Sequence, residues 1–218
     1  MTLVQKMIRC PRAFDPDLGA EAVRAVPDLP DGAGPLIHGT AGSSPYLAGL
    51  ITREASWRPE AFDEPERALA DEIARGAVTP ADQLAVVLRQ SKRRVALLTA
   101  LADLAGAWSL TKVTQALSDF ADSATQAALT ACIAAQVKRG KLPGVSADDL
   151  ASAGGMVVLA MGKMGAGELN YSSDIDLICL FDETRFDPSD FADARMGFVR
   201  ATRAMAAMLS DLAGWRHV

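Results

Sequence analysis

MVVLAMGKMGAGELNYSSDIDLICLF, residues 156–181, contains two short apolar runs separated by a glycine-rich segment. The first run, at 156–162, is rich in β-branched residues, and the second, at 174–181, is similar in length and composition. Such runs are typical of buried strands. The second run opens with two acidic residues, Asp174 and Asp176. We therefore predict a strand, a glycine-rich loop and a second strand that begins with an acidic pair.

The acidic pair has the spacing of a metal site. Because side chains alternate between the two faces of a strand, Asp174 and Asp176 are predicted to point the same way from backbone positions about 7 Å apart. Two carboxylates placed like this can hold Mg²⁺, and carboxylate-bound Mg²⁺ supports in-line phosphoryl transfer. We predict catalytic and metal-binding roles for both. The alternative is a surface hairpin in which the two aspartates only cap strand ends.

The glycine-rich segment has the composition of a phosphate-binding loop. Glycines at Gly162, Gly165 and Gly167 let backbone N–H groups approach phosphate oxygens closely. Lys163 and the hydroxyl of Ser173 add further donors, so we predict that these five residues bind a nucleotide. The segment is neither a GxxxxGK[ST] P-loop nor a GxGxxG dinucleotide fingerprint, because the glycine order differs from both.

Outside this stretch the chain is dominated by helical patterns. Helix-spaced apolar residues, with capping and stop signals, predict helices at 45–57, 65–76, 79–106, 109–140 and 189–214, the last one ended by Gly214. Thr79 is the expected N-cap of the third helix. The proline- and glycine-rich run at 27–45 is predicted to be a loop. The long helices are expected to pack as a bundle.

The domain organisation follows from these patterns and from a change of composition near 142–154. We predict an irregular segment over 1–44 with one short helix near 16–26, a helical region over 45–142, and a unit containing the two strands over 150–218. The fold class is therefore α+β and predominantly helical, with an N-terminal helical bundle followed by a partial β-sheet core.

Composition excludes several classes of protein. A formal net charge of −5 disfavours nucleic acid as a partner. The three cysteines lie far apart with no metal-binding spacing, so a disulfide framework and a zinc site are not expected. No segment approaches the roughly 20 apolar residues of a membrane span. We expect a cytoplasmic protein without a membrane partner.

A short basic run, Lys92-Arg93-Arg94, lies inside the predicted third helix. Such a run is usually a solvated helix face. The alternative is a surface that meets an anionic partner or a nucleotide phosphate.

The ordered string of Gly162, eleven residues and Asp174-x-Asp176 resembles the signature of the nucleotidyltransferase superfamily. Within it, GKMGAGELNYSSDIDLI at 162–178 is similar to a phrase specific to bifunctional glutamine synthetase adenylyltransferase/adenylyl-removing enzymes. Three further stretches resemble the N-terminal half of that enzyme family: SPYLAGLI at 44–51, KRRVALL at 92–98 and VTQALSDFAD at 113–122.

This resemblance implies a helical region followed by an incomplete nucleotidyltransferase core that acts in nitrogen metabolism. The implied partners are glutamine synthetase and a nucleotide (ATP, ADP or AMP), and the implied reaction is phosphorolytic removal of AMP from a modified tyrosine. By motif position, Asp174 and Asp176 would hold Mg²⁺. The loop from Gly162 to Gly167, with Ser173, would face the phosphates, and Glu168 and Asn170 would brace the loop.

The chain departs from the superfamily pattern in one respect. A third carboxylate is usual on a later strand, but only residues 215–218 follow the last predicted helix. Because a misplacement of about 1 Å can reduce a rate on the order of 100-fold, we expect weak or no activity from this chain alone. The chain could be a fragment of a longer enzyme or a naturally truncated product, and the sequence does not decide between them. Two alternative functions also stay open: a non-catalytic regulatory or interaction module, and a nucleotidyltransferase that acts on an acceptor other than glutamine synthetase.

An open sheet that lacks its next strand would also expose an apolar face, so self-association is expected as well.

Overall fold

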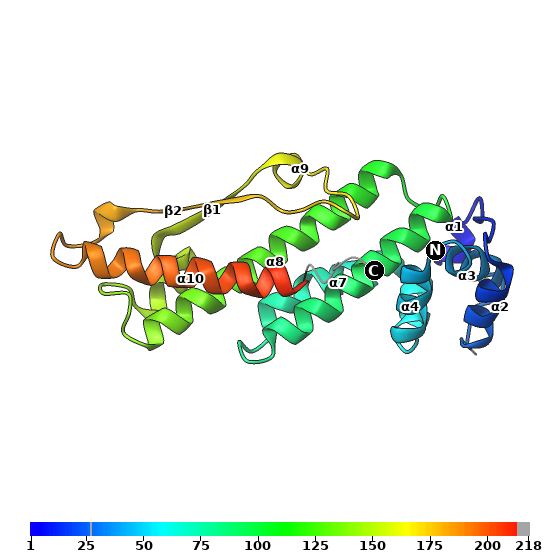
Figure 1. Cartoon of the computed structure of the whole chain (residues 1–218), viewed down its shortest axis with the longest axis horizontal. Helices are drawn as coiled ribbons and strands as arrows, with labels where there is room; N and C mark the ends of the chain where they lie inside the picture. The colour runs from blue at the N-terminus through cyan, green and yellow to red at the C-terminus, as the bar shows by residue number, and fades with distance from the viewer. Residues whose placement is uncertain (27, 213–218) are drawn as a thin grey trace.

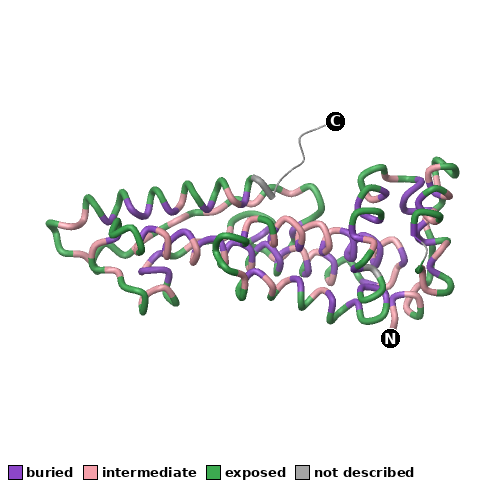
Figure 2. The backbone as a smooth tube through the Cα atoms, turned by 90° about the horizontal axis from the view of Figure 1, so that it is seen from below, coloured by how far each residue is buried: buried purple, intermediate pink, exposed green. Residues whose placement is uncertain are grey.

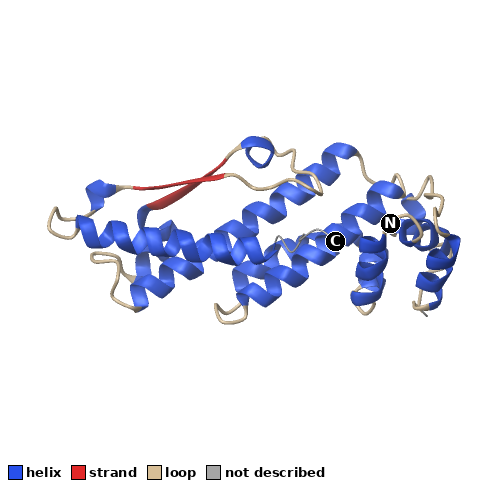
Figure 3. Ribbon diagram, viewed as in Figure 1, coloured by secondary structure: helices blue, strands red, loops and turns tan. Residues whose placement is uncertain are grey.

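The computed structural model describes residues 1–26 and 28–212 and is an elongated, predominantly helical molecule with one pair of strands (Figure 1, Figure 3). The expected α+β fold class is confirmed. The elements, in chain order, are α1 (Leu3–Lys6), α2 (Pro16–Arg24), α3 (Gly34–Ala41), α4 (Pro45–Arg53), α5 (Arg58–Asp63), α6 (Pro65–Ala74), α7 (Leu84–Leu104), α8 (Leu110–Lys138), β1 (Met156–Ala160), α9 (Gly162–Gly165), β2 (Leu177–Phe181) and α10 (Phe191–Leu212). Short 3₁₀ helices occupy Arg75–Val78, Ala147–Gly155 and Glu183–Arg185.

The N-terminal segment is more helical than the sequence indicates. Three helices, α1 to α3, lie within the first 44 residues, so the prediction of an irregular segment with one helix was wrong there. The predicted loop at 27–45 contains α3, which accepts a proline in its first turn. Burial of Leu36 and Ile37 in the core stabilises this helix despite the glycine and proline around it.

The longer helices match their predictions, with two boundary corrections. The helix predicted at 79–106 begins five residues later, at Leu84, because the Thr79 hydroxyl bonds to the carbonyl of Arg75 (2.7 Å) in the preceding 3₁₀ turn instead of capping a helix. The helix predicted at 45–57 ends at Arg53 and is followed by α5. The predicted stop at Gly214 lies outside the described residues.

Two hydrophobic clusters form the interior. The first joins α1 to α6 to the C-terminal half of α7 and the beginning of α8. The second joins α7, α8, α10 and the inner side of the strands. Buried and exposed residues alternate along each turn of α10, as expected for an amphipathic helix packed on one side (Figure 2). The predicted domain boundaries stay a prediction, since the second cluster draws on both sides of 142–154.

The strands β1 and β2 form an antiparallel pair in which Met156 lies opposite Phe181 and Ala160 opposite Leu177. The pair lies along α8 and α10 (Figure 1). Its inner face packs into the second cluster, where the ring of Phe181 stacks on that of Phe198 on α10 at a centroid separation of 4.7 Å. This contact attaches the strand pair to α10.

The outer face of the strand pair is apolar and exposed. Its side chains are Val157, Leu159, Met161, Ile178 and Leu180, each between 44% and 54% exposed. Continuous apolar runs predict strands buried on both faces, so that expectation was wrong for the outer face of both strands. Self-association through this face stays a prediction.

None of the helices in the described residues is both long enough and apolar enough to cross a membrane.

One carboxylate, Glu66 on α6, joins three parts of the bundle. Its Oε1 accepts from Nζ of Lys6 (2.6 Å), Nζ of Lys112 (2.6 Å) and Nε1 of Trp108 (3.1 Å). Burial alone would raise the pKa of the Glu66 carboxyl, but the hydrogen bonds from the two lysines outweigh it and lower the pKa from 4.5 to about 2. The ionised carboxylate therefore stabilises the contact between α1, α6 and α8.

This depressed pKa predicts a specific acid sensitivity. The stabilisation is present above the unfolded-state pKa and is lost as the pH falls from about 4.5 toward about 2. Between pH 4.5 and about 2 the free energy of unfolding should fall less in Glu66→Gln than in the wild type. Urea midpoints at several pH values measure this difference. The effect should be modest, because the Glu66 side chain is 45% exposed and solvent screens it. Glu64→Gln is the control, because it removes an exposed carboxylate close by in the sequence. Equal pH profiles for the wild type and Glu66→Gln would contradict the assignment.

Candidate functional site

The acidic pair lies immediately before β2. Asp174 and Asp176 precede the first strand residue, Leu177, so the prediction that the strand itself begins with them was three residues early. The pairing nevertheless extends to Asp176, whose carbonyl accepts from the backbone N–H of Met161 (2.9 Å). Exposure alternates along this segment, with both aspartates exposed and Ile175 between them partly buried. This alternation is the pattern expected if both side chains leave the same face, and the placement of the two carboxylates on one face stays a prediction.

The glycine-rich segment forms the single helical turn α9 and the bend that follows it. Gly162 (φ +56°) and Gly167 (φ +70°) adopt the left-handed backbone conformation that favours glycine. Gly165 is required for a different reason. A β-carbon there would lie 2.4 Å from the carbonyl oxygen of Ala160, so only glycine lets α9 pack this closely on the end of β1.

The glycine turn and the acidic pair meet at one point. A β-carbon built on Gly162 would lie 3.7 Å from Oδ2 of Asp176. The start of α9 and the Asp176 carboxylate therefore border the same exposed space at the end of the strand pair. Lys163 is exposed beside it, on α9. The structure thus brings Gly162 and Asp176 together, while the binding roles predicted for these residues and for Lys163 stay predictions.

Asn170 organises the turn that precedes the acidic pair. Its Oδ1 accepts from the hydroxyl of Ser173 (2.6 Å) and from the backbone N–H of Ser172 (3.2 Å). The bracing role predicted for Asn170 is confirmed. Ser173 Oγ also accepts from the backbone N–H of Asn170 (3.2 Å), so this predicted phosphate donor is used within the turn.

The helical bundle holds this turn in place through contacts that sequence patterns do not reveal. The backbone N–H of Leu169 donates to Oγ of Ser118 on α8 (3.1 Å). The hydroxyl of Tyr171 donates to Oδ2 of Asp103 on α7 (3.5 Å), and burial, reinforced by Asp103, raises the pKa of Tyr171. The available signals were a tyrosine in the loop and a serine on a helix, and neither indicates a partner 51 to 68 residues away.

A sequence profile described as glutamate-ammonia ligase adenylyltransferase matches residues 32–214. The chain belongs to the glutamate-ammonia ligase adenylyltransferase family. This confirms the resemblance identified from the motif at 162–178.

Curated relatives of this adenylyltransferase family give the same result. The chain is 42% identical over 183 residues to the bifunctional glutamine synthetase adenylyltransferase/adenylyl-removing enzyme of Bradyrhizobium sp. strain BTAi1, with 81% of this chain and 18% of that protein covered. The protein of the same description from Bradyrhizobium diazoefficiens is 43% identical over 182 residues, covering 81% and 18%. That from Rhodopseudomonas palustris strain TIE-1 is 34% identical over 229 residues, covering 95% and 23%. The chain thus spans about a fifth of the length of these relatives. No solved structure matches it significantly.

The residues of this adenylyltransferase-family chain fit Mg²⁺ as a partial site. Mg²⁺ is commonly bound by one or two carboxylates, with water and substrate phosphates completing the octahedron. Asp174 and Asp176 are both exposed and can supply those two ligands. Within residues 1–26 and 28–212, no group of three or more His, Cys, Asp or Glu side chains is arranged to hold a metal. The remaining ligands would therefore come from the nucleotide and from water.

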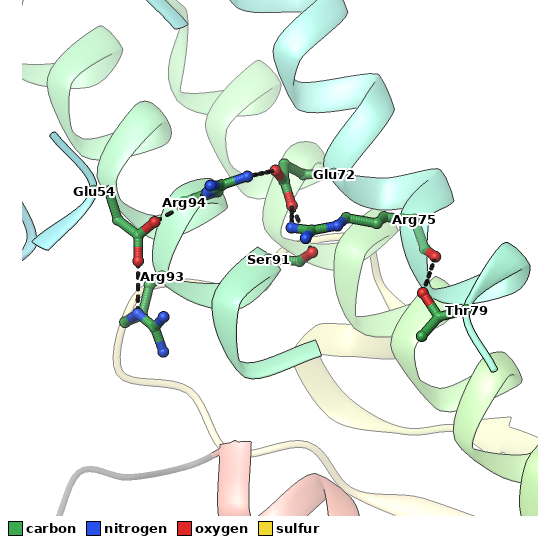
Figure 4. Close-up of polar contacts among 7 residues, drawn as sticks. All are labelled: Glu54, Glu72, Arg75, Thr79, Ser91, Arg93 and Arg94. Atoms are coloured by element: carbon green, nitrogen blue, oxygen red, sulfur yellow. Dashed lines mark hydrogen bonds and ion pairs between the residues drawn. The ribbon is translucent and has the colours of Figure 1, made fainter. Parts of the chain in front are cut away.

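The basic run on α7 is not a solvated face over its whole length. Arg93 Nε bonds to Glu54 Oε1 (2.8 Å), and Arg94 bonds through Nε to Glu54 Oε2 (3.0 Å) and through Nη1 to Glu72 Oε1 (2.6 Å) (Figure 4). Both glutamates are buried. The solvated-face prediction was therefore wrong for the two arginines, which join α4 and α6 to α7. Lys92 is half-buried. Burial lowers the pKa of its ammonium group, and the negative charge of Asp174 acts in the opposite direction.

Proposed function

We propose that this chain carries the nucleotide-binding part of an adenylyl-removing site that acts on glutamine synthetase. In this proposal Asp174 and Asp176 hold Mg²⁺, and the turn from Gly162 to Gly167 receives the phosphates of the nucleotide. The observation that carries the proposal is the juxtaposition of Gly162 with the Asp176 carboxylate, at a site where both are exposed. Membership of the glutamate-ammonia ligase adenylyltransferase family supports the choice of partner and chemistry.

The proposed reaction is phosphorolysis of the bond between AMP and a tyrosine of glutamine synthetase. An oxygen of inorganic phosphate attacks the AMP phosphorus, the bond to the tyrosine oxygen breaks, and that oxygen takes up a proton, so that ADP and free tyrosine result. Bound Mg²⁺ would offset the negative charge on the reacting phosphates. The part of this chain is to position the phosphates between α9 and the acidic pair, while the contact of Leu169 with Ser118 holds the intervening turn against α8.

The test is magnesium-dependent nucleotide binding. We expect the chain to bind ADP more tightly with Mg²⁺ than without it in isothermal titration calorimetry. Asp174→Asn and Asp176→Asn should each weaken the magnesium-dependent part about tenfold, which corresponds to about 1.4 kcal/mol. Asp17→Asn is a matched control, because Asp15-Pro-Asp17 has the same D-x-D spacing at the start of α2, away from the strand pair.

Formation of ADP from adenylylated glutamine synthetase provides the second measurement. The chain is incubated with adenylylated glutamine synthetase, inorganic phosphate and Mg²⁺, and product is quantified against both aspartate variants. Slow ADP formation is expected, because two carboxylates position the reacting phosphate less firmly than three would. The proposal would be refuted if the affinity for ADP did not depend on Mg²⁺ and was unchanged in both aspartate variants. That result would favour a non-catalytic interaction module.

A cytoplasmic location and self-association stay predictions. Sedimentation of the chain over a range of concentrations measures self-association directly.

A further inference from the structure

The C-terminal end of α7 is capped by the N-terminal segment of the chain. The last carbonyl groups of a helix have no donor within the helix. Arg9 supplies two of the missing donors, because its Nη2 donates to the carbonyl of Asp103 (2.9 Å) and its Nε to that of Leu104 (3.3 Å). The backbone N–H groups of Ile8 and Arg9 both donate to the carbonyl of Ala105 (3.0 and 3.2 Å). Residues 8 and 9 are therefore fixed to this helix end.

Gly106 allows this close approach. It follows α7 with a φ of +67°, and a β-carbon there would lie 2.6 Å from Cγ1 of Ile8. The helix end is thus shaped to receive the N-terminal segment. Arg9 lies outside residues 32–214, which the family profile matches, so membership of the family assigns it no role.

The turn before the acidic pair is attached to the same helix end. The Tyr171 hydroxyl donates to Oδ2 of Asp103 (3.5 Å) and also contacts the buried Thr99, one turn earlier on α7. The other carboxylate oxygen of Asp103, Oδ1, lies 3.9 Å from Nη2 of Arg9. The Asp103 carboxylate therefore lies between Arg9 and Tyr171, with one oxygen toward each.

The position of Tyr171 bears on the acidic pair because Tyr171 belongs to a closed turn. Oδ1 of Asn170 accepts from the Ser172 N–H and from the Ser173 hydroxyl, and the Ser173 N–H donates to the carbonyl of Asn170 (3.2 Å). Residues 170–173 are therefore expected to move as one unit. Asp174 follows this unit directly, so a displacement of Tyr171 would displace the start of the acidic pair.

We infer that Arg9 is a positioning residue for the candidate site. Its guanidinium is fixed by two carbonyl groups of α7 and holds the Asp103 carboxylate in the place where it receives Tyr171. Through Tyr171 it holds the turn that leads into Asp174. The consequence for nucleotide binding rests on the proposed function. The N-terminal segment is in this way part of the frame of the site.

Backbone amide hydrogen exchange tests this attachment without any ligand. Arg9→Met keeps an unbranched side chain but removes the guanidinium, so Asp103 loses its partner in the N-terminal segment. We expect the amides of Ser172 and Ser173 to exchange about threefold faster than in the wild type, because a turn that is held less firmly opens more often.

Two controls separate this effect from a general loss of stability. The amide of Leu169 should exchange at the wild-type rate in Arg9→Met, because Ser118 on α8 holds it (3.1 Å). Arg12→Met is the matched variant, since Arg12 is an exposed arginine of the same segment that forms no ion pair within residues 1–26 and 28–212. It should leave all three amides unchanged.

A double-mutant cycle measures the consequence for nucleotide binding. Arg9→Met and Tyr171→Phe are each expected to weaken magnesium ADP binding about threefold in calorimetric titrations. If Arg9 acts through Tyr171, the double variant should also lose about threefold, whereas independent effects would multiply to about ninefold. Arg9→Lys keeps the charge and one donor, so it should recover part of the affinity.

The outcomes distinguish this inference from the proposed function. Unchanged exchange at Ser172 and Ser173 in Arg9→Met would overturn the inference, and so would an equal increase at Leu169 or independent losses in the double variant. In each of these cases magnesium ADP binding that depends on Asp174 would leave the proposed function intact. A wild-type chain that binds no magnesium ADP would overturn the proposed function and the role of Arg9 in nucleotide binding together.

Discussion

Arg94→Met is expected to reduce the free energy of unfolding by about 3–5 kcal/mol, because it leaves two buried carboxylates short of a partner. The guanidinium of Arg94 bonds to Glu54 and Glu72, which are 3% and 4% exposed (Figure 4). It also lies 5.3 Å from the ring centre of Trp57. Methionine preserves much of the apolar volume but none of these interactions.

Urea denaturation followed by circular dichroism measures this effect. Arg67→Met is the control, since Arg67 pairs with Glu60 and Glu64 on the surface and such pairs contribute about 1 kcal/mol or less. A loss in Arg94→Met no larger than that in Arg67→Met would contradict the importance of the network. The remaining donors would then suffice to satisfy the two carboxylates: Ser91 (2.5 Å) and Arg75 (3.3 Å) to Glu72, and Arg93 to Glu54 (2.8 Å).

Gly165→Ala is expected to destabilise the chain by about 1–3 kcal/mol and to weaken magnesium ADP binding as well. The added methyl group would meet the Ala160 backbone at 2.4 Å, and a backbone atom cannot move aside as the end of a side chain can. Relief of the clash requires α9 to shift away from β1. Such a shift would carry Gly162 away from Asp176 and widen the candidate site.

Gly49→Ala is the matched control. Gly49 lies on the exposed side of α4 with no atom within 4 Å of the added β-carbon, so alanine should stabilise that helix by about 0.5–1 kcal/mol. Unfolding midpoints and ADP titrations are compared for both variants. If Gly165→Ala matched the wild type in stability and in ADP binding, the close packing of α9 on β1 would have no role in the site.

Local signals predicted much of the helical architecture. Ser44 and Ser109 cap α4 and α8 through bonds to the N–H groups of Leu47 and Lys112, as their positions before helical patterns indicate. Signals of this kind act over three or four residues, so they can be recognised in the sequence alone. Prediction failed at α3, where burial of Leu36 and Ile37 outweighs a local composition typical of loops.

The candidate site was also predictable only in part. The order of glycines and aspartates from Gly162 to Asp176 is a local property and was sufficient to identify the family. The structural reason for each glycine could not be predicted from that order. Gly165 was expected to approach a phosphate, but its missing side chain accommodates the backbone of β1, because that contact depends on how α9 folds back on the strand.

By itself, the sequence determined the helices with clear caps, the two apolar strands, the exposure of Asp174 and Asp176 on either side of the partly buried Ile175, and membership of the adenylyltransferase family. These features depend on residues near one another in the chain. Only the tertiary structure decided that Arg93 and Arg94 turn inward to the buried glutamates Glu54 and Glu72. Those partners lie 22 to 40 residues apart, and no local pattern specifies which elements pack together, since that choice is made by burial of apolar surface across the whole chain.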